Sequence, residues 1–299
     1  MGGRLSAGLG GEGLTQPAVS TRALTATGEL CFAAMGTRIE LHRFGGGAPE
    51  ALAMAQRAIE LVDDALTIHR PSPATALNEA LRSGRCAAID DPILLDALVR
   101  IDDARSVTAG LFDPSVDARH GSVGWKDVRL DRRAMTIACA APIAMDFGGF
   151  GKGYALDRAV VALRETQVDC ALLSAGESSI AVIGEHPLGG AWSFAIPDPR
   201  DAEQMLVEVA LIDEALSISA TIGGGIDAPE RAAMLRPGDA AAIVAPRTAI
   251  VVDRSGAMAE MLSTALIVAD DAAARRLHDG TRRMLFELET AAAPTRMFV

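Results

Sequence analysis

The segment from Asp146 to Asp157, DFGGFGKGYALD, constrains the fold of this chain more than any other. It follows an apolar run and holds four glycines and Lys152. Glycines let backbone N–H groups come close to an anion, and a helix N-terminus attracts negative charge. A helix is predicted to follow because apolar residues recur at helical spacing, namely Leu156, Ala159, Val160 and Leu163. The segment therefore predicts a phosphate-binding turn between a strand and a helix, with a purely structural turn as the alternative.

Six further motifs occur in order along the chain: Met35 to Thr37 (MGT), Thr67 to Ser72 (TIHRPS) with Leu77 and Asn78 behind it, Leu111 to Val116 (LFDPSV), Gly124 to Val128 (GWKDV), Leu173 to Ser179 (LSAGESS), and Ala259 to Ala265 (AEMLSTA). Together with the glycine-rich segment, they resemble the ordered motifs of the ApbE-type flavin transferases. Members of that family move FMN from FAD onto a threonine of another protein. The glycine-rich segment is similar to the family signature D-[LF]-G-G-[IF]-[AG]-K-G-Y-A-x-D.

The resemblance implies an α+β fold, with a single ApbE-like (T-fold-like) domain in which helices flank a mixed antiparallel sheet. We expect this domain to span residues 29–299, after a flexible tail at residues 1–28. Apolar patterning predicts strands between 128 and 146 and at 30–43, 170–174, 180–183, 192–196, 207–212 and 241–245, and helices at 49–68, 92–109, 257–269 and 271–278. Asp91 is a plausible N-cap for the second of these helices.

A magnesium site is implied by the similarity of Ala259 to Ala265 to the metal-binding A-D-A-L-[AS]-T-A of the family. Glu260, Ser263 and Thr264 are spaced i, i+3 and i+4, so their oxygens can face one point on a helix. Magnesium prefers oxygen ligands of this kind. The resemblance adds the backbone carbonyl of Gly149 as a ligand and makes Glu260 and Thr264 the catalytic residues. Without the resemblance, Glu260 would be interpreted as an acid on a helix surface.

The resemblance also implies contacts to the flavin or the nucleotide from Met35, His69, Leu111, Phe112, Asp113, Asp146 and Lys152. Several of these residues have a structural alternative. Met35 could be a core residue, His69 a surface histidine and Asp113 a turn former. Asp146 stands at the entry to a glycine turn, where an Asx turn competes with a binding role.

The sequence departs from the family at several points. His69 stands where most members have an aromatic residue that can stack on a ring. The family segment H-I-I-D-P-R-T-G corresponds to residues 233–239 (AMLRPGD), where the histidine and the aspartate are missing. The family segment A-T-S-G-D-Y is replaced at 219–225, and the metal-binding aspartate is replaced by the longer Glu260.

Two classes of function remain open on this basis. The first is a magnesium-dependent FAD:protein FMN transferase, which attaches FMN from FAD to a threonine or serine of a flavin-acceptor protein and releases AMP. The second is a degenerate, non-catalytic FAD-binding homologue, and an FAD pyrophosphate hydrolase lies between the two. The acceptor protein and the oligomeric state do not follow from the sequence.

Composition narrows the remaining possibilities. A formal charge of −11 argues against nucleic acid as a partner, because phosphate backbones require clustered cations. Four cysteines and five histidines show no zinc spacing. The first 28 residues hold no apolar run typical of an export signal, so we expect a cytoplasmic protein, or a periplasmic one if the true start lies upstream. No apolar stretch approaches the roughly 20 residues of a membrane span.

Overall fold

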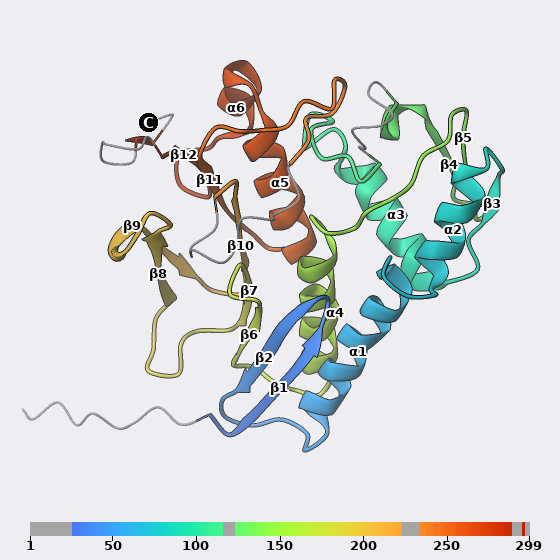
Figure 1. Ribbon diagram of the computed structural model, residues 1–299. Coiled ribbons are helices and arrows are strands. Elements are labelled where there is room, and N and C mark those ends of the chain that lie inside the picture. Colours follow the sequence, from blue (N-terminus) through green and yellow to red (C-terminus); the bar gives the residue numbers. More distant parts are fainter. Residues whose placement is uncertain (1–25, 116–122, 223–233, 289–294, 297–299) are drawn as a thin grey trace, which may run out of the picture.

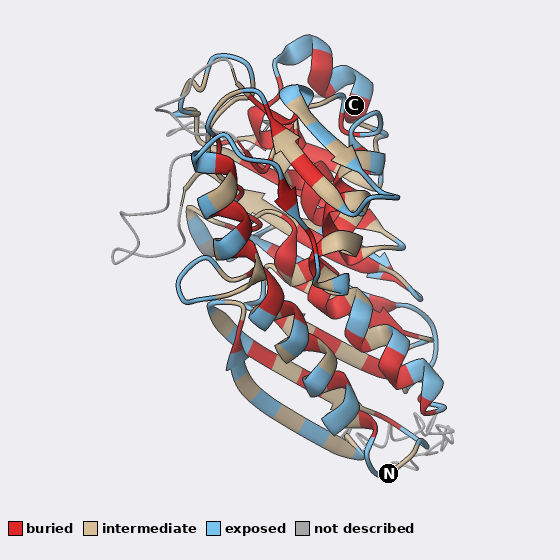
Figure 2. Cartoon of the chain, turned by 90° about the vertical axis from the view of Figure 1, so that its right-hand side faces the viewer, coloured by how far each residue is buried: buried red, intermediate tan, exposed pale blue. Residues whose placement is uncertain are grey.

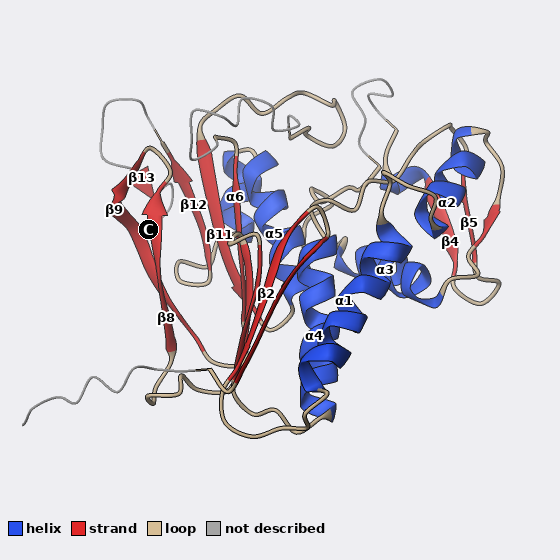
Figure 3. Cartoon of the chain, turned by 60° about the horizontal axis from the view of Figure 1, so that its bottom comes forward, coloured by secondary structure: helices blue, strands red, loops and turns tan. Residues whose placement is uncertain are grey.

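The structure is a computed structural model that describes residues 26–115, 123–222, 234–288 and 295–296 of the 299-residue chain. The predicted tail at residues 1–28 therefore lies almost entirely outside the described residues. An antiparallel sheet forms the centre of the molecule, with helices on one face and a long hairpin on the other (Figure 3). No helix in the described ranges is both long and apolar enough to cross a membrane.

Within the described residues, the central sheet has eight strands, and every pair of neighbours is antiparallel. In spatial order the strands are β1 (Gly28–Ala34), β2 (Thr37–Arg43), β6 (Ala171–Ala175), β7 (Ser179–Ile183), β10 (Ala215–Ala220), β11 (Arg247–Asp253), β12 (Arg283–Glu287) and β13 (Thr295–Arg296). The predicted α+β fold with an antiparallel sheet and flanking helices is confirmed.

One face of this sheet is covered by helices α1 (Ala51–Leu66), α4 (Gly151–Glu165) and α5 (Gly256–Val268). Helix α4 lies between the other two and contacts β6 and β7, whereas α5 contacts β10 and β11. Eleven residues of α5 are buried, because the helix is enclosed by the sheet and by α4. Figure 2 shows the buried residues gathered where the helices face the sheet. Helix α6 (Asp271–Leu277) follows α5.

A smaller layer lies beyond α1, at the right of Figure 1. It consists of α2 (Pro73–Arg82), α3 (Pro92–Ala104), the short helix η1 (Trp125–Asp127) and a three-stranded sheet of β3 (Ala87–Ala88), β5 (Thr136–Cys139) and β4 (Val128–Asp131). The side chain of Asp91 accepts the N–H groups of Ile93 and Leu94, so its predicted N-cap role is confirmed. Helix α2 was not predicted; Ser72 caps it by accepting the N–H of Thr75.

The other face of the central sheet is covered by the hairpin of β8 (Trp192–Asp198) and β9 (Asp201–Leu211). A second apolar cluster fills the space between this hairpin and the sheet, with Trp192 and Leu211 from the hairpin and Ile250 and Phe286 from the sheet. Strands β11 and β12, which pack against the hairpin, have continuous runs of buried residues, whereas β1 alternates between exposed and half-buried residues.

Two strand predictions are wrong. Residues 30–43 form a hairpin rather than one strand, because Met35 and Gly36 both adopt positive φ angles, 54° and 69°, and reverse the chain. Residues 241–245 form only one isolated bridge, and the strand that enters the sheet is β11, directly after them. The stretches 241–245 and 247–253 are both apolar and similar in composition, so periodicity does not show which of them forms the strand.

The predicted helix at 92–109 is also too long. Helix α3 ends at Ala104, and the chain then turns through positive φ angles at Ala109 and Gly110. The Gly110 N–H donates to the carbonyl of Arg105, which satisfies one of the carbonyls left free near the helix end.

Helices α4 and α5 touch through their backbones at two glycines. A Cβ atom at Gly153 would overlap the carbonyl oxygen of Gly256, and a Cβ atom at Gly256 would lie 2.6 Å from the carbonyl oxygen of Gly153. Neither helix can therefore carry a side chain at this crossing. The contact sets the distance between the first turns of the two helices.

Replacing Gly153 by alanine tests this contact. The gain in helix propensity is about 1 kcal/mol, but the overlap with backbone atoms is expected to cost more, so the net loss of unfolding free energy should be about 1–3 kcal/mol. Urea denaturation measures it. Gly46→Ala is the control, because no atom lies within 4 Å of a Cβ there, and its change should stay within about 0.5 kcal/mol. Equal effects of the two substitutions would contradict a tight crossing.

Candidate functional site

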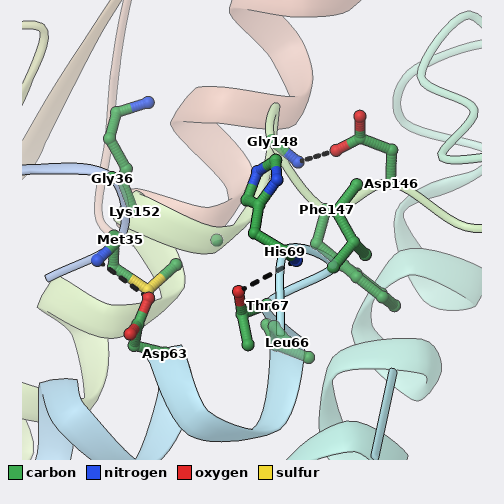
Figure 4. A pocket seen from close by; sticks show the side chains of 12 residues that line it. Met35, Gly36, Asp63, Leu66, Thr67, His69, Asp146, Phe147, Gly148 and Lys152 are labelled. Atoms are coloured by element: carbon green, nitrogen blue, oxygen red, sulfur yellow. Dashed lines mark hydrogen bonds between the residues drawn. The ribbon is translucent and has the colours of Figure 1, made fainter. Parts of the chain in front are cut away.

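A cavity of about 160 Å³ lies where the β1–β2 turn, the C-terminal end of α1 and the loop before α4 meet. Met35 and Asp63 are on one side of it and Asp146 and Phe147 on the other, with the ring of His69 between them (Figure 4). Four of the residues predicted to contact flavin or nucleotide line this cavity, namely Met35, His69, Asp146 and Lys152. Leu111, Phe112 and Asp113 are not among its lining residues.

The β1–β2 turn is tied to helix α1. The backbone N–H of Met35 donates to Oδ1 of Asp63 at 2.9 Å, and Oδ2 of Asp63 accepts from the guanidinium of Arg70 at 2.8 Å. The Met35 side chain lies over the start of α4, since a Cβ atom at Gly151 would come within 2.6 Å of its Cε. Asp63 and Arg70 therefore position Met35 at the cavity. The sequence did not predict these roles of Asp63 and Arg70, although Arg70 lies within the motif from Thr67 to Ser72.

The loop before α4 is anchored at two points. Oδ1 of Asp146 accepts the N–H of Gly148 at 2.8 Å, which is the Asx turn considered as the alternative for this residue. Next to it, the buried amide of Asn78 accepts the N–H of Met145 and donates to its carbonyl, at 2.6 Å and 2.9 Å. Asp146 thus has a structural bond as well as a place in the wall of the cavity.

Asp113 has a structural role that accounts for both of its oxygens. Oδ1 accepts the N–H and the hydroxyl of Ser115, and Oδ2 accepts the N–H of Trp125 at 2.8 Å. This matches the turn-forming alternative. Phe112 is buried, and its ring would lie 3.2 Å from a Cβ atom at Gly149, whereas Leu111 is half-buried against the main core.

Glu260 is buried, with 3% of its side chain exposed, so it is not the surface acid that a bare sequence would suggest. Oε1 accepts the hydroxyl of Ser179 at 2.6 Å and lies 3.1 Å from Nζ of Lys152. Oε2 is buried and has no hydrogen-bond partner among the described residues. A buried carboxylate oxygen without a donor is costly, so this atom points to a missing partner.

Two further oxygens lie near this carboxylate. Thr264 is one helical turn after Glu260 on α5, and its Oγ1 would be 2.9 Å from a Cβ atom at Gly149. Within the described residues, neither the Thr264 hydroxyl nor the Gly149 carbonyl takes part in a hydrogen bond. The fold therefore brings together Gly149, Glu260 and Thr264, three of the four residues predicted to hold magnesium, and places Lys152 beside Glu260.

Ser263 does not join this group. Its hydroxyl lies 3.0 Å from that of Ser217 and 2.8 Å from that of Ser219, both on β10. The side chain thus faces the sheet, where it ties α5 to β10.

The donor set fits a magnesium ion. Oε2 of Glu260, Oγ1 of Thr264 and the Gly149 carbonyl are hard oxygens, and none of them is used by another group among the described residues. The set supplies a single carboxylate, and the described residues contain no cluster of three acidic, histidine or cysteine side chains. An ion held here would therefore need further ligands from water or from a substrate phosphate.

Asp157, the last residue of the glycine-rich segment, joins α4 to the N-terminus of α5. Its carboxylate accepts the hydroxyl of Ser255 at 2.6 Å and the N–H groups of Gly256 and Ala257 at 2.6 Å and 3.1 Å. Burial raises the pKa of this carboxyl, and the three donors oppose the rise. Asp157 therefore holds the helix that carries Glu260 against the helix that carries Lys152.

The segments that depart from the family are only partly described. Residues 223–233 lie outside the described residues, which covers part of both divergent stretches. In the remainder, Arg236 and Asp239 form an ion pair with each other at 2.7 Å.

Comparisons with known proteins identify the family and the fold of this chain. The family model described as "ApbE family" matches residues 115–286, more than half of the chain, and the chain belongs to this family. The curated "FAD:protein FMN transferase" of Rhodobacter capsulatus is 28% identical over an alignment 198 residues long, which covers 56% of this chain and 37% of that protein. The chain thus spans little more than a third of the length of that relative.

Three solved structures share the fold over 90% of this chain, each with a TM-score of 0.74. They are the ApbE protein of Thermotoga maritima (19% identical, 96% of that chain covered), the flavin transferase ApbE of Vibrio cholerae (18%, 95% covered) and the flavinyl transferase ApbE of Pseudomonas stutzeri in its apo form (20%, 94% covered).

Replacing Asn78 by alanine tests the anchoring of the loop before α4. The substitution leaves the buried N–H and carbonyl of Met145 without partners, so unfolding free energy should fall by about 2–4 kcal/mol. Chemical denaturation measures the loss. Glu79→Ala, at an exposed position of the same helix, is the matched control and should change stability by less than about 0.5 kcal/mol. A loss for Asn78→Ala no larger than that of the control would show that the loop is held by other contacts.

Proposed function

We propose that this protein is a magnesium-dependent FAD:protein FMN transferase. The observation that carries the proposal is a group of three oxygens, from Gly149, Glu260 and Thr264, that have no hydrogen-bond partner among the described residues. They lie beside Lys152, which also lines the cavity. Membership of the ApbE family and the activity of the Rhodobacter relative support the same conclusion.

FAD is the proposed substrate. Met35 and His69 would contact the flavin end, and Lys152 would contact the pyrophosphate with a point charge. The cavity is smaller than the roughly 300 Å³ at which ligand pockets begin, so it can hold only one end of FAD. We expect the other end to lie outside it.

The proposed reaction is a transfer of a phosphoryl-linked group. The hydroxyl oxygen of a threonine or serine on the acceptor protein bonds to the phosphorus of the FMN half of FAD. The pyrophosphate P–O bond breaks, AMP leaves with the bonding electrons, and the proton of the hydroxyl is released. The products are a phosphoester-linked FMN, AMP and a proton.

The residues of this chain would act by positioning and charge. Glu260, oriented by Ser179, would hold magnesium together with Thr264 and the Gly149 carbonyl. When bound, magnesium would supply the positive charge that stabilises the phosphoryl group and the departing AMP. Asp157 would keep helices α4 and α5, which carry Lys152 and Glu260, at a fixed separation through its bonds to the start of α5.

The second candidate is an FAD-binding homologue without transfer activity. The absence of the family's histidine and aspartate at 233–239 favours it, since Arg236 and Asp239 there pair with each other. An FAD pyrophosphate hydrolase, with water as the acceptor, is the intermediate case. The cavity and the oxygen cluster are consistent with the transferase, the hydrolase and the non-catalytic homologue. The products of the reaction must therefore distinguish these three functions.

The deciding experiment incubates the purified protein with FAD, magnesium and an acceptor peptide of the pattern D-x-x-[ST]-[GS]-A-[ST], with and without EDTA. Mass spectrometry detects FMN on the peptide, and chromatography separates FAD, FMN and AMP. Flavinylated peptide with an equal amount of AMP supports the transferase. Free FMN with AMP identifies the hydrolase, and bound FAD without AMP identifies the non-catalytic homologue.

Glu260→Ala is expected to lower the transfer rate by roughly 100-fold or more, because removing one charged stabilising group of a phosphoryl site has an effect of that order. Glu165→Ala, at an exposed position near the end of α4, should leave the rate unchanged. An active Glu260→Ala variant with undiminished magnesium dependence would contradict the assignment of this residue.

A further inference from the structure

The ion pair between Lys152 and Glu260 raises a conflict within the proposed function. There, Glu260 binds a divalent cation and Lys152 binds phosphate, yet in this structure each charge is used by the other, at 3.1 Å. Ser179 also donates to the same oxygen, Oε1, so that half of the carboxylate is fully engaged. The two residues cannot perform both pairs of tasks in the same arrangement.

The net charge of this group of residues disfavours a metal ion that binds alone. The ammonium of Lys152 and the carboxylate of Glu260 sum to zero, and the Thr264 hydroxyl and Gly149 carbonyl are neutral. A divalent cation at Oε2 would therefore enter a site without net negative charge, close to a positive ammonium and in a buried setting where repulsion is strong. The nucleotide supplies the missing negative charge, because a pyrophosphate is an anion that attracts both cations.

We propose that Lys152 is an internal counter-ion that competes with the divalent cation for Glu260, and that the pyrophosphate of the nucleotide relieves this competition by drawing Lys152 away. Metal and nucleotide then bind cooperatively, and neither binds tightly alone. This inference rests on the proposed function and adds an order of events to it.

The position of Lys152 permits such a movement. It is in the first turn of α4, a quarter of its side chain is exposed, and it also lines the cavity. Ser179 keeps Glu260 oriented when the lysine leaves. The neighbouring Asp146 and Asp157, in contrast, accept hydrogen bonds from backbone N–H groups, which hold their carboxylates in place. Lys152 is therefore the charged group here that can change partner.

The choice of lysine is consistent with this role. The chain has 28 basic residues, and Lys152 and Lys126 are its two lysines. An arginine can grip a carboxylate with two parallel hydrogen bonds, whereas an ammonium is a point charge on a flexible stem. Lysine therefore suits a position whose side chain must leave a carboxylate and move to a phosphate.

Manganese binding tests the competition directly. Mn²⁺ is titrated into protein without nucleotide and followed by electron paramagnetic resonance. Lys152→Met keeps the length of the side chain and removes its charge, so Mn²⁺ should bind roughly tenfold or more tightly than in the wild type, a coupling of ordinary size. Lys126→Met, an exposed lysine, should bind as the wild type does. Circular dichroism checks that each variant is folded.

Adding FAD without acceptor completes the test. In the wild type, FAD should tighten Mn²⁺ binding by roughly tenfold, and by linkage Mn²⁺ should tighten FAD binding by the same factor. In Lys152→Met this coupling should nearly vanish. The two lysines also give separate signals in protein labelled at lysine Nζ with ¹⁵N, and only the signal lost in Lys152→Met should move on addition of FAD.

The outcomes separate the two proposals. If the wild type transfers FMN but Lys152→Met binds Mn²⁺ no more tightly than the wild type, the competition is wrong and the transferase stands. If the Lys152 signal does not move with FAD, the change of partner is wrong. If no variant binds Mn²⁺ even with FAD present, both the competition and the magnesium dependence of the proposed function are wrong.

Discussion

The contact between the backbones of helices α4 and α5 at Gly153 and Gly256 is the constraint on which the rest of the site depends. It allows the first turns of the two helices to approach more closely than side chains would permit. Asp157 then fastens the crossing by accepting two N–H groups and a hydroxyl from the start of α5. As a result, Lys152 on one helix and Glu260 on the other lie within contact distance.

The site concentrates unsatisfied polar groups in a well-packed surrounding. In the described part of the chain, one buried oxygen of Glu260 has no partner, and helix α5, which carries this residue, is otherwise almost entirely apolar and buried. Such a group lowers stability, and proteins keep it where it serves binding or chemistry. The surrounding anchors, such as the amide of Asn78 on Met145, hold the loop before α4 in place beside this carboxylate.

Much of the site could be predicted from local sequence. The helix after the glycine-rich loop, the N-cap at Asp91 and the i, i+4 spacing of Glu260 and Thr264 are local features with a fixed geometry, and the structure has them all. The hairpin turn at Met35 was missed, because an ordinary residue with positive φ leaves no trace in an apolar pattern. The strand β11 was missed because its neighbouring stretch has the same composition.

The sequence by itself determined the family, the α+β class and the residue types of the proposed site, because ordered motifs and helical spacing are properties of the chain. Only the tertiary structure decided which polar side chains of the proposed site have hydrogen-bond or ion-pair partners elsewhere in the described residues. Ser263 bonds to β10, Asp113 to a turn, and Glu260 to Lys152 and Ser179. These partners come from distant parts of the chain, and their distances depend on how the helices and strands pack, which no local pattern records.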